Sequence, residues 1–223
     1  MVSDFIKLSV ENIPILIRGL PVTIMLSLLG VVLALLVGIV GGVLGNSSFR
    51  TLRAIAKVYV YIFRNVPFLI FLYLVFYGLP YADIHLAALP TAIIALVINH
   101  GAYMSEIIRG GLSSIKKEQK EAAISLGLTY SQRMRKVILP QVLMQIAGST
   151  AGQTSLLIKD TSIVSVIGLS ELTRLGREIV VRTYTPFSIF LFVAIFYFIL
   201  CYSMQKLSDW SEKKVRRYTM GTA

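Results

Sequence analysis

Five long apolar runs alternate with shorter polar segments along the chain. They cover residues 20–45, 58–79, 89–108, 143–169 and 187–204. A helix needs about 20 residues to cross the hydrocarbon core of a bilayer, so each run predicts one transmembrane span. The fourth run is the weakest, because it contains Lys159 and Asp160 as well as two glutamines. The pattern predicts an all-α integral membrane protein, with five spans in a single transmembrane domain over residues 1–223.

Composition supports a membrane protein. Of 223 residues, 56% are hydrophobic and 15% are charged, and the mean hydropathy is +0.75. A soluble domain is usually about one quarter charged. The lone Cys201 excludes a disulfide within the chain and a site with several cysteines. The first 19 residues lack the basic start, short apolar core and small-residue cleavage site of a secretory signal.

The basic residues predict the orientation of the spans. The net charge of +11 would also suit a nucleic-acid-binding protein, but these residues lie between and beyond the apolar runs. The loop after the first run has three Lys or Arg, the segment after the third has seven and the tail has five, which makes fifteen on one side. The other side has five. By the positive-inside rule the N-terminus lies outside, and the C-terminus and the polar segment 109–142 lie in the cytoplasm.

The polar segment between the third and fourth runs has its own helical pattern. Residues 117–126 are mostly good helix formers, and Gly127 suits the left-handed conformation that closes a helix. Thr129 and Gln132 have capping-box spacing for a second helix, which should run to about Leu139, with Pro140 at the start of the fourth span. The alternative is a solvated basic loop that only sets topology. The capping signals favour order, and order in an exposed loop suggests a partner.

Polar residues inside spans mark candidate transport paths, because such residues tend to face the bundle interior or a water-filled cavity. Two helical stripes stand out, one in the third run and one in the fourth. The candidates that line the path are Asn99, Tyr103, Glu106, Ser149, Gln153 and Asp160.

Each stripe also has a structural interpretation. Glu106 can pair with Arg109, three residues on, and Lys159 with Asp160 can form an ion pair to a partner subunit or to Arg64. For His100 a satisfied interhelical hydrogen bond is favoured. Pro67 is expected to kink the second span. The small-xxx-small pattern at Gly38, Gly41, Gly42 and Gly45 favours close helix packing within one subunit over a dimer seam.

Several motifs resemble those of one transporter family. Glu-Ala-Ala at 121–123, Gly127, an aliphatic Val137 and Leu139-Pro140 reproduce the EAA motif of permease subunits of ABC importers. Further segments are similar to the polar amino acid branch, the histidine, glutamine and cystine type: 64–67, 102–111, 139–141 and 159–168. Two departures are Glu118, where most relatives have Gly, and Gly152-Gln153, where an Asn-Glu pair is common; the second puts a substrate-binding carboxylate there in doubt.

The resemblance implies a type I importer in the bacterial cytoplasmic (inner) membrane. A second permease subunit, identical or homologous, would pair with this one, and two cytoplasmic ATP-binding subunits would carry ATP and Mg. An external substrate-binding protein would deliver a polar amino acid or a derivative such as cystine or an opine. The resemblance assigns ATPase coupling to Glu121, Ala122, Ala123, Gly127, Leu139 and Pro140.

Missing motifs agree with a subunit that is not an enzyme. The chain contains no Gly-Lys pair, so it has no GxxxxGK[ST] phosphate-binding loop, and it has no HExxH metal motif. We therefore expect no cofactor on this chain and no nucleic-acid partner. The rival functions are an ion-coupled secondary amino acid transporter, which would favour internal repeats and more spans, and a membrane scaffold that uses the basic loop only for binding.

Overall fold

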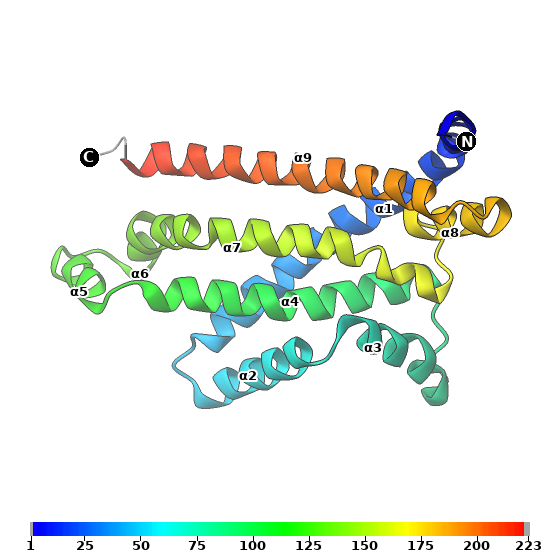
Figure 1. Ribbon diagram of the computed structural model, residues 1–223. Helices are drawn as coiled ribbons and strands as arrows, with labels where there is room; N and C mark the ends of the chain where they lie inside the picture. The colour runs from blue at the N-terminus through cyan, green and yellow to red at the C-terminus, as the bar shows by residue number, and fades with distance from the viewer. Residues whose placement is uncertain (1, 221–223) are drawn as a thin grey trace. The chain divides into compact units, whose positions relative to one another are not determined.

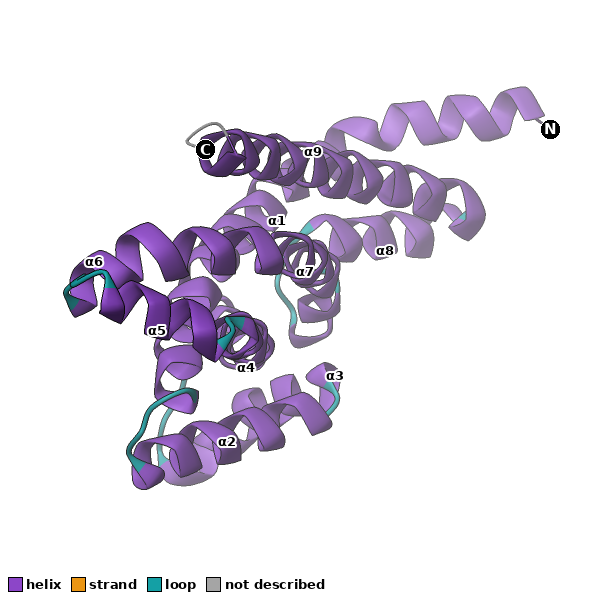
Figure 2. Cartoon of the chain, turned by 90° about the vertical axis from the view of Figure 1, so that its left-hand side faces the viewer, coloured by secondary structure: helices purple, strands orange, loops and turns teal. Residues whose placement is uncertain are grey.

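The computed structural model describes the backbone of residues 2–220 and the side chains of residues 11–206 and Asp209. The charge count from the sequence includes Lys7 and the basic residues at 213–217. Their side chains lie outside the described residues. The described backbone contains helices and connecting loops and no strand (Figure 2). The elements in order (Figure 1) are α1 (Val2–Gly45), α2 (Arg50–Asn65), α3 (Phe68–Tyr73), η1 (Leu74–Gly78), η2 (Leu79–Ala82), α4 (Ala88–Ser114), α5 (Lys117–Ser125), α6 (Tyr130–Arg133), η3 (Met134–Ile138), α7 (Leu139–Asp160), η4 (Ile163–Ile167), α8 (Leu172–Thr183) and α9 (Pro186–Met220).

Within the described residues, three helices are long and apolar enough to cross a membrane. They are residues 11–45 of α1, the whole of α4, and residues 186–206 of α9. A fourth span results if α2 and the helical stretch 68–82 are counted as one broken helix. At about 1.5 Å per residue, the 22 residues of α7 are long enough to cross, but glutamines and two charges make this helix less apolar. Five spans therefore stay a prediction.

Element boundaries differ from the expected ones at Pro67 and at the N-terminus. The first helix begins at Val2, not near residue 20, and continues through Pro14 and Pro21. The kink expected at Pro67 is a complete break, because Pro67 is extended (φ −56°, ψ 134°) and a new helix starts after it. A proline disfavours the helical conformation in the preceding residue, which explains why α2 ends just before Val66.

The chain divides into two compact units. One contains residues 1–33, 66–97 and 155–203, and the other contains 34–65, 98–154 and 204–223. In the first unit, α1, α8 and α9 pack around five buried aliphatic side chains: Leu16, Leu172, Ile179, Ile189 and Val193. A Cβ at Gly176 would lie 2.8 Å from Val193 Cγ2, so this glycine lets α8 approach α9 closely.

In the second unit, the end of α4 packs against η3 and the start of α7. The buried side chains are Ile108, Leu112, Ile115, Ile138 and Val142. The glycines near the end of α1 pack against α4 in the same unit; a Cβ at Gly42 would lie 2.7 Å from Ile108 Cγ2. The small-xxx-small stripe thus serves packing within the subunit, as the favoured interpretation predicts.

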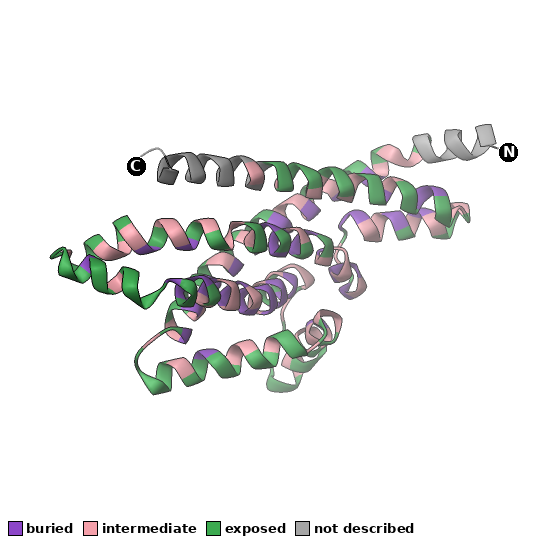
Figure 3. Cartoon of the chain, turned by 60° about the vertical axis from the view of Figure 1, so that its left-hand side comes forward, coloured by how far each residue is buried: buried purple, intermediate pink, exposed green. Residues whose placement is uncertain are grey.

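The long apolar helices differ in how far their residues are buried. In the most apolar stretch of α4, 61% of residues are buried, against 28% in α1 and 17% in α9 (Figure 3). The exposed side chains of α1 and α9 are largely aliphatic or aromatic, for example Val32, Val40, Phe190 and Phe198. Apolar side chains on the outside of a helix suit contact with lipid rather than with water.

Candidate functional site

The polar loop folds as the capping signals predict. Gly127 has φ +72°, and its N–H donates to Ile124 O while that of Leu128 donates to Ala123 O. This bond pair is the Schellman arrangement, which satisfies the last carbonyls of a helix. At the next helix start, Thr129 N donates to Gln132 Oε1 at 2.9 Å and Gln132 N donates to Thr129 Oγ1 at 3.3 Å. The predicted capping box is confirmed, and both helix ends at this turn are satisfied locally.

The second helix of the loop does not stop near Leu139 as expected. The short α6 continues directly into the π-helical turn η3 and then into α7, so Pro140 lies inside a continuous helical stretch. Proline has no N–H to donate and would leave an α-helical carbonyl unpaired. A π-helical turn immediately before the proline is the kind of local adjustment that accommodates this gap.

Three large apolar side chains of the helix–turn–helix, residues 117–133, are exposed. The exposed fraction is 55% for Ile124, 79% for Leu126 and 68% for Tyr130. The Arg133 guanidinium lies 5.8 Å from the centre of the Tyr130 ring. Sequence reasoning missed these three residues, although an apolar side chain in a strongly polar segment is a usable signal. Exposed apolar groups close together in sequence on a polar element favour an interaction surface.

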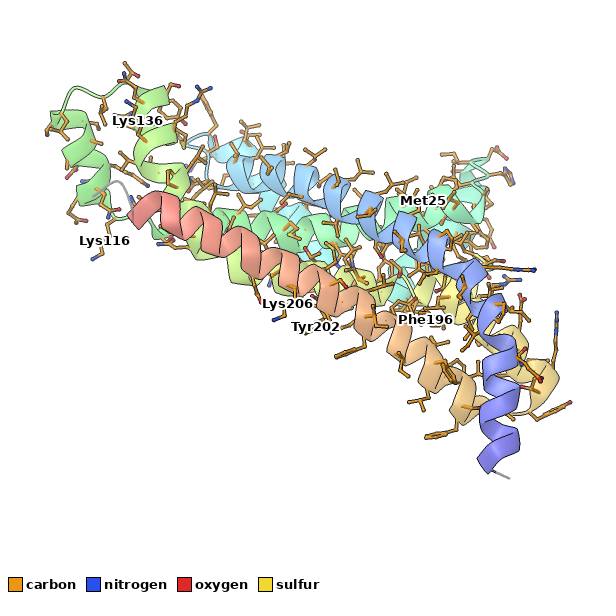
Figure 4. The ribbon with its side chains drawn as sticks, turned by 90° about the horizontal axis from the view of Figure 1, so that it is seen from above. Met25, Lys116, Lys136, Phe196, Tyr202 and Lys206 are labelled. Atoms are coloured by element: carbon orange, nitrogen blue, oxygen red, sulfur yellow. The ribbon has the colours of Figure 1, made fainter. Side chains whose placement is uncertain are left out.

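The motif residues divide between the inside and the surface of the loop. Ala123 is buried, whereas Glu121, Ala122, Gly127 and Leu139 are exposed and Pro140 is partly buried. Glu121 lies 3.1 Å from Lys117 Nζ in an exposed ion pair, which contributes little to stability. Basic side chains border the loop, with Lys116 before α5 and Lys136 in η3 (Figure 4).

Within the second unit, the two ends of the loop join α4 and α7, which pack against each other. A Cβ at Gly111 of α4 would clash with Ile146 of α7, so these two helices meet closely where the loop leaves and returns. Ser114 Oγ donates to Gln145 Oε1 across the same contact. The helix–turn–helix therefore stands on a packed base formed by α4 and α7.

A cavity of about 850 Å³ lies beside α4 in the same unit. It is lined by the end of α1, by α2 and by one face of α4, and its charged residues are Lys57, Arg64, Glu106 and Arg109. Arg109 binds the Glu106 carboxylate with one edge of its guanidinium, donating from Nε to Oε2 at 2.8 Å and from Nη2 to Oε1 at 2.6 Å. The pairing expected for Glu106 is thus present. Because this pair is neutral as a whole, Lys57 and Arg64 leave the cavity wall positive.

Tyr103 connects two walls of the cavity. Its hydroxyl donates to Arg64 O at 3.2 Å, and the Arg64 guanidinium lies 5.3 Å from the centre of the Tyr103 ring. This cation–π contact holds the Arg64 guanidinium beside the Tyr103 ring in the cavity wall. The sequence suggests Arg64 as an ion-pair partner of Lys159 and Asp160. The structure shows that Arg64 also contacts the ring of Tyr103.

The other predicted path residues do not gather at the cavity. Asn99 is buried and donates to Phe63 O at 2.9 Å. Gln153 is also buried, and its Nε2 lies 2.7 Å from His100 Nδ1, which confirms the interhelical hydrogen bond expected for His100. Ser149 is exposed on α7. Lys159 and Asp160 belong to the first unit. Of the six candidates, Tyr103 and Glu106 line the cavity.

Long apolar helices, an ordered polar loop and a charged cavity define a membrane transport component. The chain belongs to the family of the binding-protein-dependent transport system inner membrane component, which matches residues 35–217. Its relatives identify it as a permease of the amino acid ABC transporters.

Relatives cover nearly the whole chain. The probable amino-acid ABC transporter permease protein YckA of Bacillus subtilis is 32% identical and covers 95% of this chain and 94% of its own length. The glutamine transport system permease protein GlnP of Escherichia coli K12 is 35% identical, with 84% of this chain and 87% of its own covered. A crystal structure of an amino acid ABC transporter with histidines is 34% identical, with 92% and 96% covered and a TM-score of 0.84. The MetNI methionine ABC transporter, 21% identical, has the same fold (TM-score 0.77, with 92% and 98% covered).

Proposed function

We propose that this chain is the five-span permease subunit of a type I ABC importer that carries a polar amino acid or a derivative across the bacterial inner membrane. The N-terminus would lie outside, and ATP with Mg would be bound by separate ATPase subunits. The observation that carries the proposal is the helix–turn–helix of residues 117–133, which is capped at both sides of Gly127 and exposes Ile124, Leu126 and Tyr130.

The loop would act as a coupling element. Its exposed apolar residues would enter a groove on the ATPase, and its base on α4 and α7 would pass the movement on. When two ATPase subunits close on nucleotide, the loops of a permease pair would be drawn together and the spans would rock as bodies. The nucleotide favours one of two arrangements, which is a population shift in a bistable assembly.

The cavity beside α4 would be part of the transport path. An amino acid carries a carboxylate, and Arg64 and Lys57 supply the positive charge in the wall that attracts such a group. The paired Glu106 and Arg109 would keep a polar surface there without adding net charge. Tyr103, which holds Arg64 by its ring and hydroxyl, would position that guanidinium.

One reconstitution experiment tests the proposal against its rivals. The permease, its ATPase and an external binding protein are placed in proteoliposomes, and ATP hydrolysis and amino acid uptake are measured with the proton gradient collapsed. We expect uptake to persist and the loaded binding protein to raise hydrolysis. Uptake that stops with the gradient would indicate an ion-coupled transporter. Hydrolysis that no binding protein stimulates would indicate a scaffold.

A further inference from the structure

The short helix α8 has one buried face and one charged face. Leu172, Gly176 and Ile179 are buried against the rest of the first unit. On the other side, a shallow hollow of about 420 Å³ is lined by Ser165, Arg174, Arg177, Glu178, Val181 and Arg182. With 12 residues, α8 is about 18 Å long, too short to cross a bilayer. It therefore lies outside the spans.

The charged face is positive after its internal contacts are counted. Arg174 Nε donates to Glu178 Oε1 at 3.1 Å, so these two charges largely offset one another. Arg177 Nη2 donates to the neutral Ser165 Oγ at 2.9 Å, which orients the guanidinium but leaves its charge. Arg182 is exposed and also borders a second hollow, which contains Arg18. The face thus presents net positive charge to its surroundings.

Two exposed side chains add apolar surface to this charge. Val181 is 71% exposed and Tyr184 is 87% exposed. Tyr184 ends α8 in the left-handed conformation at φ 53°, which is unfavourable for a residue other than glycine. Strained positions of this kind gather at functional sites. Arginine and tyrosine beside an aliphatic side chain are also the residues that contribute most to protein–protein interfaces.

From this combination we infer that the α8 face, defined as Arg177, Val181, Arg182 and Tyr184, is a docking surface for the acidic patch of a soluble external protein. The inference rests on the proposed function, under which that protein is the substrate-binding protein and α8 is on the external side. A second copy of this chain fits poorly, because a symmetric contact through the same face would bring arginines against arginines. Complementary charge would mainly accelerate docking and select the partner.

Contacts in the first unit would carry the effect of docking inward. At the first turn of α8, Leu172 N donates to Thr23 Oγ1 of α1 at 3.2 Å. The side chain of Glu171 receives a hydrogen bond from Tyr197 of α9 at 2.8 Å. A Cβ at Gly19 would lie 2.8 Å from Leu172 N, so α1 and α8 are in backbone contact. A partner that pulls on α8 therefore pulls directly on two of the apolar helices.

The test uses the complete complex in proteoliposomes, with the binding protein that stimulates the wild-type complex as the probe. Hydrolysis is measured against its concentration for wild type and for the double variant Arg177→Glu/Arg182→Glu. We expect the half-saturating concentration of the binding protein to be at least about tenfold higher for the double variant than for wild type. For wild type, this concentration should rise as salt is added. Hydrolysis without binding protein and at saturation should stay near the wild-type values. The control Arg50→Glu reverses one arginine charge at the exposed start of α2, half the charge change of the double variant, and should leave half-saturation unchanged.

Each other outcome is decisive. An unchanged half-saturating concentration in the double variant overturns the docking surface, while stimulation of the wild type still supports the proposed function. If the wild-type complex is not stimulated by any binding protein, it is the proposed function that fails. If the variant differs from wild type only in vesicles that contain an anionic phospholipid, and not in neutral vesicles, the face binds lipid headgroups and the inference is wrong.

Discussion

The hydroxyl of Tyr197 donates a hydrogen bond to Glu171 Oε2 at 2.8 Å and thereby joins α9 to the start of α8. Glu171 is completely buried and caps α8 by accepting from Thr173 N and Arg174 N, each at 2.8 Å. Three donors around one carboxylate satisfy a group that would otherwise be very costly to bury. This junction holds the helix that we assign to partner docking.

Replacing Tyr197 with Phe should destabilise the first unit. The ring volume is kept, but the hydrogen bond to the buried carboxylate is lost, which costs about 1.5–3 kcal/mol for a charged acceptor. We expect a lower midpoint of thermal unfolding for the purified variant. Tyr81→Phe is the matched control in the same unit, because its side chain is 95% exposed and little should change. Equal midpoints for the two variants would show that the bond adds no stability.

Stability should also depend on pH through Glu171. Burial raises the pKa of this carboxyl above its ordinary value of 4.5, and its hydrogen bonds only partly oppose the effect. The folded state therefore binds the proton more tightly than the unfolded state. The contribution of this group is fully favourable below pH 4.5 and is lost as pH rises through the raised pKa.

The measurement is the unfolding midpoint as a function of pH. Glu171→Gln should remove the decline that begins above pH 4.5. Tyr197→Phe should shift that decline to higher pH, because the Tyr197 hydrogen bond lowers the pKa of Glu171. A decline of the same size in Glu171→Gln would assign the pH dependence to other groups.

Local chemistry explains which features could be predicted from sequence. Gly127, Thr129 and Gln132 act within a few residues of one another, so their pattern alone predicts the turn and the capping box. Glu171 and Tyr197 are 26 residues apart, and His100 and Gln153 are 53 apart. Such pairs form only when distant helices pack. For His100 the sequence indicates a bond but not its partner, and no local pattern points to Glu171.

Prolines and charges set the limits of the helix predictions. The rule that proline disrupts a helix succeeded at Pro67, where the helix breaks. It failed at Pro14, Pro21 and Pro140, which lie within helical stretches. The charged residues near the N-terminus concealed the early start of α1, because an apolar run predicts the part of a helix in the bilayer and not the part beyond it.

Gly127→Val should uncouple transport from ATP hydrolysis. A β-branched residue resists the φ of +72°, at a cost of about 1–2 kcal/mol, and the Schellman turn would be disturbed. We expect membrane insertion to remain normal while co-purification of the ATPase or stimulated transport falls. Gly127→Asn is the control, because asparagine tolerates the left-handed conformation and should retain most activity. Normal transport by the valine variant would refute the role of this turn.

Leu126→Gln should weaken the association of the ATPase. Leu126 is 79% exposed, so its loss should not affect the stability of the permease alone. Burial of a leucine side chain in a partner groove is worth about 1.5–3 kcal/mol, which corresponds to roughly a tenfold or greater loss of affinity. Affinity is measured between the purified permease and the ATPase. Val181→Gln removes a similarly exposed apolar side chain from α8 and should leave ATPase affinity intact; a loss of equal size there would argue against a specific surface on the loop.

Two glycine-to-alanine substitutions separate helix propensity from helix packing. Alanine is favoured over glycine inside a helix by about 1 kcal/mol, so both Gly42→Ala and Gly148→Ala should stabilise if propensity alone decided. The structure predicts opposite signs. At Gly42 the new Cβ would lie 2.7 Å from Ile108 Cγ2 and 3.0 Å from Ser105 O, whereas a Cβ at Gly148 would have no described atom within 4 Å apart from its chain neighbours and the nearby backbone of its own helix. Gly42→Ala should therefore lower the unfolding midpoint by separating α1 from α4, and Gly148→Ala should raise it or leave it unchanged. A higher midpoint for Gly42→Ala would mean that α1 and α4 do not approach each other so closely.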